Sequence, residues 1–121
     1  MKKGVIMVER RLYPRKYLMF YSRVFDQKTG ELLGHIIDIT PAGAMLISEK
    51  PLEIGKVFHL QMELPDDLSN RQFLVFEAKS VRGSQDVIPE FYDTGMQLID
   101  VAPADIALIE KLVESFGFRE R

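Results

Sequence analysis

The sequence predicts a small, mainly β protein: an antiparallel β-barrel followed by one C-terminal α-helix. Short apolar runs, rich in β-branched and aromatic residues, alternate with turns that contain Gly, Pro and Asp. Short strands at such regular intervals are typical of closed β architectures. Only the last segment changes to helical spacing. A length of 121 residues suits one domain with a real core and is short for two.

The alternation of apolar and polar residues places the strands. It is clearest over residues 56–64, where Phe58, Leu60 and Met62 fall on one face and the residues between them on the other. Residues 26–30, 65–70 and 83–90 read as connections. We expect a bulge at Gly95, which interrupts the last strand. The predicted strands are residues 17–25, 32–39, 43–48, 56–64, 72–82 and 92–99.

The final segment has the pattern of an amphipathic helix. Pro103 lies near its first turn and Gly117 just past its end, which is the usual placement of these residues. We expect this helix to pack on the sheet or to cap one end of the barrel. Its apolar positions recur at helical spacing: Ile106, Ile109, Leu112, Val113 and Phe116.

The charge is distributed unevenly. Residues 1–16 carry six Lys or Arg and one acid, a net of +5, whereas the remaining 105 residues carry ten basic and 17 acidic side chains, a net of −7. We therefore divide the chain into a basic N-terminal arm, 1–16, and a barrel with its helix, 17–121. Such an arm on an acidic body suggests an anionic ligand bound locally, and argues against DNA or RNA.

Composition limits the location and the chemistry. The chain has no cysteine, so disulfides and thiolate sites are excluded, and a cytoplasmic location is expected. No apolar run approaches the ~18 residues of a membrane span, so we expect no membrane insertion. His35 and His59 lie in different predicted strands without partners at metal spacing. We therefore predict no metal, no cofactor and no enzyme activity.

Two stretches carry binding chemistry. Asp38-Ile39-Thr40-Pro41-Ala42-Gly43 lies between two predicted strands, and turn formation alone would account for its Asp and Thr. Upstream, Arg10-Arg11-Leu12-Tyr13-Pro14-Arg15 has the opposite charge and no evident structural purpose. Arginine binds phosphate through paired donors and stacks on purines. A carboxylate such as that of Asp38 can accept from the N1–H and N2–H₂ edge of guanine.

The order and spacing of these stretches resemble the PilZ domain family. Arg11-x-x-x-Arg15 and Asp38-x-Thr40-x-x-Gly43 correspond to that family's signatures RxxxR and (D/N)xSxxG. Residues 76–82 and 92–99 look like later strands of the family, so the resemblance covers about residues 9–118. It implies a six-stranded antiparallel β-barrel in a bacterial protein that binds the second messenger cyclic di-GMP.

The resemblance also implies residue roles. Arg11 and Arg15 would bind phosphate and guanine with help from Arg10, while Asp38, Thr40 and Gly43 would contact the other side of the ligand. Thr40 stands where the family has serine, which keeps the hydroxyl but adds a methyl group and puts the affinity in doubt. Leu98 replaces a common phenylalanine.

Arg82 lies where some family members carry a tryptophan that stacks on guanine. A guanidinium can also stack on a base. The alternative is a solvated arginine at a strand end.

The resulting hypothesis is a cyclic di-GMP receptor whose mobile arm is clamped by the ligand and which signals to a separate protein, in motility or biofilm regulation by analogy. The main alternative is a PilZ-fold adaptor that binds no nucleotide, as in pilus assembly. A single-stranded nucleic-acid barrel is a weaker alternative and an enzyme the weakest. Monomer or homodimer, and one ligand or an intercalated pair, stay open at this stage.

Overall fold

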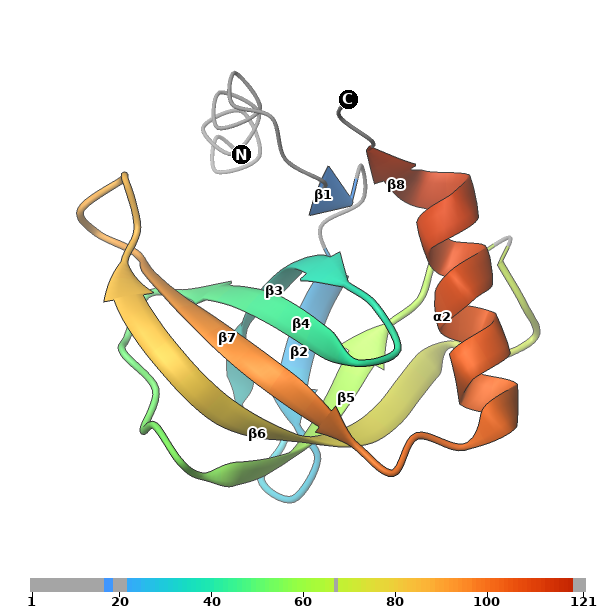
Figure 1. The fold of residues 1–121 in the computed structure, drawn as a ribbon, viewed down its shortest axis with the longest axis horizontal. Helices are drawn as coiled ribbons and strands as arrows, with labels where there is room; N and C mark the ends of the chain where they lie inside the picture. The colour runs from blue at the N-terminus through green and yellow to red at the C-terminus, as the bar shows by residue number, and fades with distance from the viewer. Residues whose placement is uncertain (1–16, 19–21, 67, 119–121) are drawn as a thin grey trace.

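The computed structural model describes residues 17–18, 22–66 and 68–118 (Figure 1). Six strands close into a barrel in the order β2-β3-β4-β7-β6-β5, and every neighbouring pair is antiparallel. The strands are β2 (Ser22–Asp26), β3 (Leu32–Ile39), β4 (Gly43–Ser48), β5 (Val57–Glu63), β6 (Phe73–Gln85) and β7 (Tyr92–Ile99). The helix α2 (Pro103–Phe116) follows, and a short ribbon pairs β1 (Tyr17–Leu18) with β8 (Gly117–Phe118).

This architecture confirms the predicted six-stranded barrel with a C-terminal helix. The predicted strands at 32–39, 43–48 and 92–99 match β3, β4 and β7 to the residue. The predicted strand at 17–25 corresponds to β1 and β2, with residues 19–21 outside the described part of the chain.

Two details of the prediction were wrong. The loop expected over residues 83–90 starts only at 86, because Gly83, Ser84 and Gln85 continue β6 by pairing with residues 94, 93 and 92 of β7. The bulge expected at Gly95 lies on the partner strand. The register shifts between Ser80 and Arg82, so β6 carries the extra residue.

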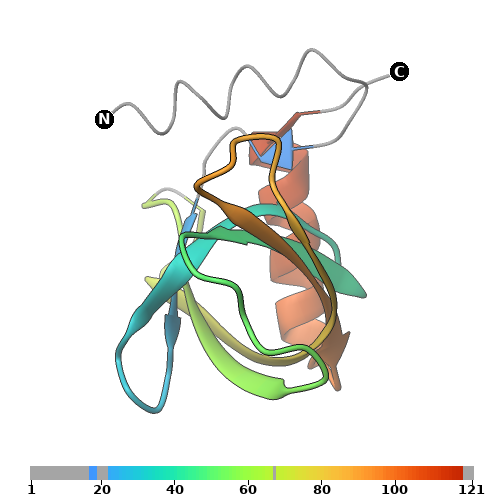
Figure 2. The same cartoon turned by 90° about the vertical axis from the view of Figure 1, so that its left-hand side faces the viewer.

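The core fills the barrel and continues under the helix. Inward side chains of every barrel strand share one apolar cluster with Leu108, Ile109 and Leu112 of α2. Glu110 and Lys111 are exposed on the opposite side of the helix, as the apolar spacing predicts. The helix lies at one end of the barrel, and the hairpin that joins β6 to β7 projects at the other end (Figures 1 and 2).

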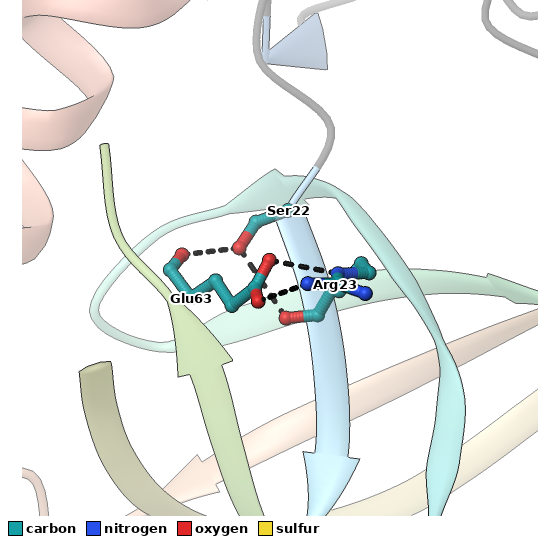
Figure 3. Close-up of polar contacts among 3 residues, drawn as sticks. All are labelled: Ser22, Arg23 and Glu63. Atoms are coloured by element: carbon teal, nitrogen blue, oxygen red, sulfur yellow. Dashed lines mark hydrogen bonds and ion pairs between the residues drawn. The ribbon is translucent and has the colours of Figure 1, made fainter. Parts of the chain in front are cut away.

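Polar contacts fasten β2 to β5, the seam that closes the barrel (Figure 3). The buried Ser22 hydroxyl donates a hydrogen bond to the backbone carbonyl of Glu63. Arg23 donates from Nε and Nη2 to the two carboxylate oxygens of Glu63, at 2.9 and 2.6 Å. This hydrogen bonding and the charge of Glu63 raise the pKa of Arg23, so Arg23 stays protonated and paired at high pH.

Candidate ligand-binding site

Asp38 and Arg82, both predicted from the sequence as ligand residues, lie in one row across the outer face of the barrel. Asp38 of β3 pairs with Met45 of β4, Met45 pairs with Gly95 of β7, and Gly95 pairs with Arg82 of β6. Neighbouring strands lie about 4.8 Å apart, so the row spans roughly 14 Å from end to end. A flat ligand with two polar ends can lie along such a row.

Bulges place both ends of the row. In β3 the register shifts between Ile36 and Asp38, and in β6 it shifts between Ser80 and Arg82. Side chains alternate strictly along a regular strand, so one extra residue moves every later side chain to the other face. Without these extra residues, Asp38 and Arg82 would point into the apolar core.

The turn after Asp38 is held by the side chain of Thr40. Its hydroxyl oxygen accepts hydrogen bonds from the backbone N–H groups of Ala42 and Gly43, at 3.2 and 3.1 Å. The Thr40 N–H donates to the carbonyl of Gly43 at 2.8 Å. Both acceptor sites of the hydroxyl are therefore occupied, and its O–H donates only a long hydrogen bond to the same carbonyl, with 3.4 Å between the two oxygens. What the hydroxyl can offer a ligand is its donor.

The barrel leaves little room for a side chain at Gly43. A Cβ at this position would lie 3.0 Å from the carbonyl oxygen of Met96. The space that a missing side chain leaves at Gly43 thus admits the backbone of β7, whether or not a ligand also approaches.

Gly95 admits the side chain of Arg82. A Cβ at Gly95 would lie 3.3 Å from Cγ, 3.4 Å from Cζ and 3.5 Å from Nε of Arg82. Arg82 is exposed to solvent, yet its stem and guanidinium lie across the glycine on the outer face. Because β6 continues to Gln85, Arg82 is not the strand-end arginine of the alternative interpretation.

A cavity of about 330 Å³ adjoins this end of the row. Its walls include Met45, Gly95 and Arg82 of the row, together with Ser84 of β6 and Asp93 of β7. The volume is near the lower end of the ~300–1,000 Å³ typical of ligand pockets. A cation, a carboxylate, a hydroxyl and apolar surface therefore meet around a space that could take one part of a ligand.

The described residues contain neither a cluster of metal-ligating side chains nor a helix that could span a membrane. Over 17–18, 22–66 and 68–118, no three His, Cys, Asp or Glu side chains gather as metal ligands. Within the same residues no helix combines the length and the apolar character of a membrane span. The imidazole of His59 lies 3.3 Å from the carboxylate of Glu77, in an ordinary surface contact between β5 and β6.

The structure thus brings together four of the seven predicted site residues: Asp38, Thr40, Gly43 and Arg82. The other three, Arg10, Arg11 and Arg15, lie outside the described residues, as does most of the predicted arm. Sequence reasoning missed Met45 and Asp93. No sequence signal marked Asp93, because Gly95, two residues further along the same strand, was expected only as a bulge.

A family model described as PilZ domain matches residues 9–115 of this chain, which include both signature stretches. The chain belongs to the PilZ domain family. This confirms the family that the two signatures indicate. No curated protein sequence matches the chain significantly.

Solved structures of other PilZ proteins share the fold. The PilZ domain of YcgR from Escherichia coli, solved with c-di-GMP, is 13% identical with a TM-score of 0.60, over 84% of this chain and 88% of that one. MotI/DgrA, an inhibitor of motility from Bacillus subtilis, is 20% identical with a TM-score of 0.64, over 85% of this chain and 51% of that one. MrkH of K. pneumonia, in its complex with c-di-GMP, is 18% identical with a TM-score of 0.62, over 84% of this chain and 50% of that one.

At these identities the likeness establishes the fold. The PilZ domain described here spans most of the YcgR domain and about half of the MotI/DgrA and MrkH chains.

Proposed function

We propose that this PilZ domain is a receptor for cyclic di-GMP rather than an enzyme. The observation that carries the proposal is the row Asp38–Met45–Gly95–Arg82, with the Thr40–Gly43 turn at one end and the cavity at the other. Its two polar ends and its length of roughly 14 Å suit a ligand with two bases, one at each end, whose phosphates are left to the basic arm.

Each group has a role that its surroundings favour. Asp38 accepts hydrogen bonds from the N1–H and N2–H₂ of a guanine. Thr40 donates its hydroxyl hydrogen to a phosphate oxygen, since its acceptor sites are used within the turn. Arg82 offers a planar guanidinium on which a purine can stack.

The basic arm supplies the positive charge that the ligand requires. Arg11 and Arg15, with Arg10, neutralise the phosphates and clamp the arm across the barrel, where the carboxylates of Asp38 and Asp93 belong to the described residues on and beside the row. The changed position of the arm is the signal, and a separate protein reads it in a process such as motility or biofilm formation. The domain works in the cytoplasm, where the second messenger is found.

The alternative is an adaptor of the same fold that acts through protein contacts alone. It is favoured by neighbouring exposed apolar side chains on the outer face of β6, away from the row: Phe73 is 36% and Val75 40% exposed. Such a face suits a protein partner. It is also compatible with a receptor that passes its signal to a partner, so ligand binding is what separates the two.

Calorimetric titration with cyclic di-GMP tests the proposal. We expect the native protein to bind with micromolar or tighter affinity, and Arg11→Ala and Asp38→Ala each to lose at least about tenfold, because each removes a charge-assisted hydrogen bond. Two controls remove the same kinds of charge at exposed positions: Lys111→Ala on the helix matches Arg11→Ala, and Asp66→Ala in a loop matches Asp38→Ala. Both controls should bind the ligand as the native protein does. No heat from the native protein at high ligand excess would reject the receptor and leave the adaptor.

A further inference from the structure

The cavity at the Arg82 end of the row contains a carboxylate for which the roles above give no use. Asp93 of β7 pairs with Ser84 of β6, and Gly95 pairs with Arg82. Residues two apart in a strand face the same side, so Asp93 lies on the outer face, one step along the strand from the Gly95–Arg82 pair. Asp93 and Arg82 are thus diagonal neighbours on adjacent strands. A ligand group that lies between them can contact both side chains.

Asp93 also stands in a fixed relation to Asp38. The two carboxylates belong to β3 and β7, and β4 with Met45 lies between them. Two interstrand spacings separate their strands, about 10 Å. Asp38 lies opposite Met45 of β4, and Asp93 lies opposite Ile47, two residues further along the same strand. The outer face therefore presents one carboxylate on either side of β4.

Cyclic di-GMP carries two guanines, and Asp38 accounts for only one of them. We propose that Asp93 is a specificity-determining residue of this site, which reads the N1–H and N2–H₂ edge of the second guanine while Arg82 stacks on that base. The inference rests on the proposed function and deepens it: the protein selects a dinucleotide in which both bases are guanine.

The chemistry of the two purines gives Asp93 its power to discriminate. Guanine presents two donors side by side, and an ionised carboxylate presents two acceptors at matching positions. Adenine presents an acceptor at N1, so its ring nitrogen would face a carboxylate oxygen with no hydrogen between them. A site built for hydrogen bonding rejects an analogue that leaves its polar group unpaired far more strongly than an apolar pocket rejects a change of size.

The test compares cyclic di-GMP with cyclic GMP–AMP, in which one guanine is replaced by adenine, in calorimetric titrations of the full chain. The native protein should bind cyclic di-GMP more tightly. In Asp93→Asn the affinity for cyclic di-GMP should fall about 10- to 100-fold, toward that for cyclic GMP–AMP, because a hydrogen-bonding carboxylate is lost. The affinity for cyclic GMP–AMP should change less than about threefold, since its single guanine is read by Asp38.

Two further variants make the result specific. Asp93→Glu keeps the carboxylate and should restore the preference for cyclic di-GMP. Asp66→Asn, in an exposed loop, makes the same chemical change away from the cavity and should leave both affinities unchanged. Circular dichroism checks that each variant folds. If Asp93→Asn does not fold, Asp93→Ser replaces it in the titrations.

The failures are distinguishable. A native protein that binds neither dinucleotide removes the proposed function and this inference with it. Tight binding of cyclic di-GMP together with an unchanged preference in Asp93→Asn and Asp93→Ser overturns the inference alone. An equal loss of affinity for both dinucleotides also overturns it, because Asp93 would then support the site without reading a base.

Discussion

Asp38 and Arg82 each directly follow the extra residue of a β-bulge, and they lie at the two ends of one row across β3, β4, β7 and β6. The extra residues have different environments. Ile37 is buried in a small apolar cluster with Ile47 and Phe91, whereas Val81 is 44% exposed. Both nevertheless reverse the alternation of their strand, so that a charged side chain leaves the core and reaches the outer face. Bulges are enriched beside functional sites for this reason.

The contact between Arg82 and Gly95 should govern the affinity for cyclic di-GMP. Arg82→Ala removes a stacking guanidinium and should weaken binding about 2- to 30-fold. Gly95→Ala places a Cβ where Arg82 now lies and should weaken binding by displacing that side chain. Calorimetric titrations of both variants and of the double variant form the measurement.

If Gly95 acts only through Arg82, the double variant should bind no more weakly than Arg82→Ala alone. Additive losses would show instead that the added methyl group obstructs the ligand itself. Thermal melting of the three variants provides the control, because both positions lie on the outer face and the core should be unaffected.

Gly43 should contribute to the stability of the barrel even without a ligand. In Gly43→Ala the new Cβ meets the carbonyl oxygen of Met96, and backbone in a closed barrel can move little. We expect a loss of about 1–3 kcal/mol in the free energy of unfolding, measured by urea denaturation.

Gly83→Ala is the matched control for this change. Its Cβ would meet Cδ1 of Ile54 at 3.2 Å, which is the free end of a half-exposed side chain that can rotate away. The control should therefore lose less stability than Gly43→Ala. Equal losses in the two variants would mean that the close approach of β7 does not set the cost.

At the seam of the barrel, the hydrogen bond from Ser22 to the Glu63 carbonyl should contribute more stability than the two from Arg23 to the Glu63 carboxylate (Figure 3). Because Ser22 is fully buried, Ser22→Ala removes a buried donor from the carbonyl of Glu63, which costs about 1–3 kcal/mol. The side chain of Arg23 is 54% exposed, so water replaces its partner when Arg23→Ala removes the pair.

Urea denaturation of the two variants gives the order directly, and a larger loss for Arg23→Ala would contradict it. The sign of the pH dependence follows from the pKa of Arg23, which is raised in the folded state. The contribution of the Arg23–Glu63 pair to the free energy of unfolding is complete below the ordinary pKa of arginine. It disappears only as the pH rises through the raised pKa of Arg23. The difference between native protein and Arg23→Ala should therefore be the same at pH 7 and pH 9.

The sequence by itself determined the class of fold and most strand bounds, and it proposed the residues of the candidate site. Alternating apolar residues and turn signals act locally, so the bounds of β3, β4, β7 and α2 could be read from neighbouring residues. The two signatures indicated the family, which the match over residues 9–115 confirms.

Only the tertiary structure decided which residues share a face of the barrel. Nothing in Ile37 or Val81 marks a bulge, because the register of a strand is set by the partner with which it pairs and not by its own residues. Pairing across the β6–β7 hairpin extended β6 to Gln85, since β7 supplies hydrogen bonds where the sequence shows no apolar pattern. The row from Asp38 to Arg82 joins residues 44 positions apart, and the pairing of β4 with β7 aligns them.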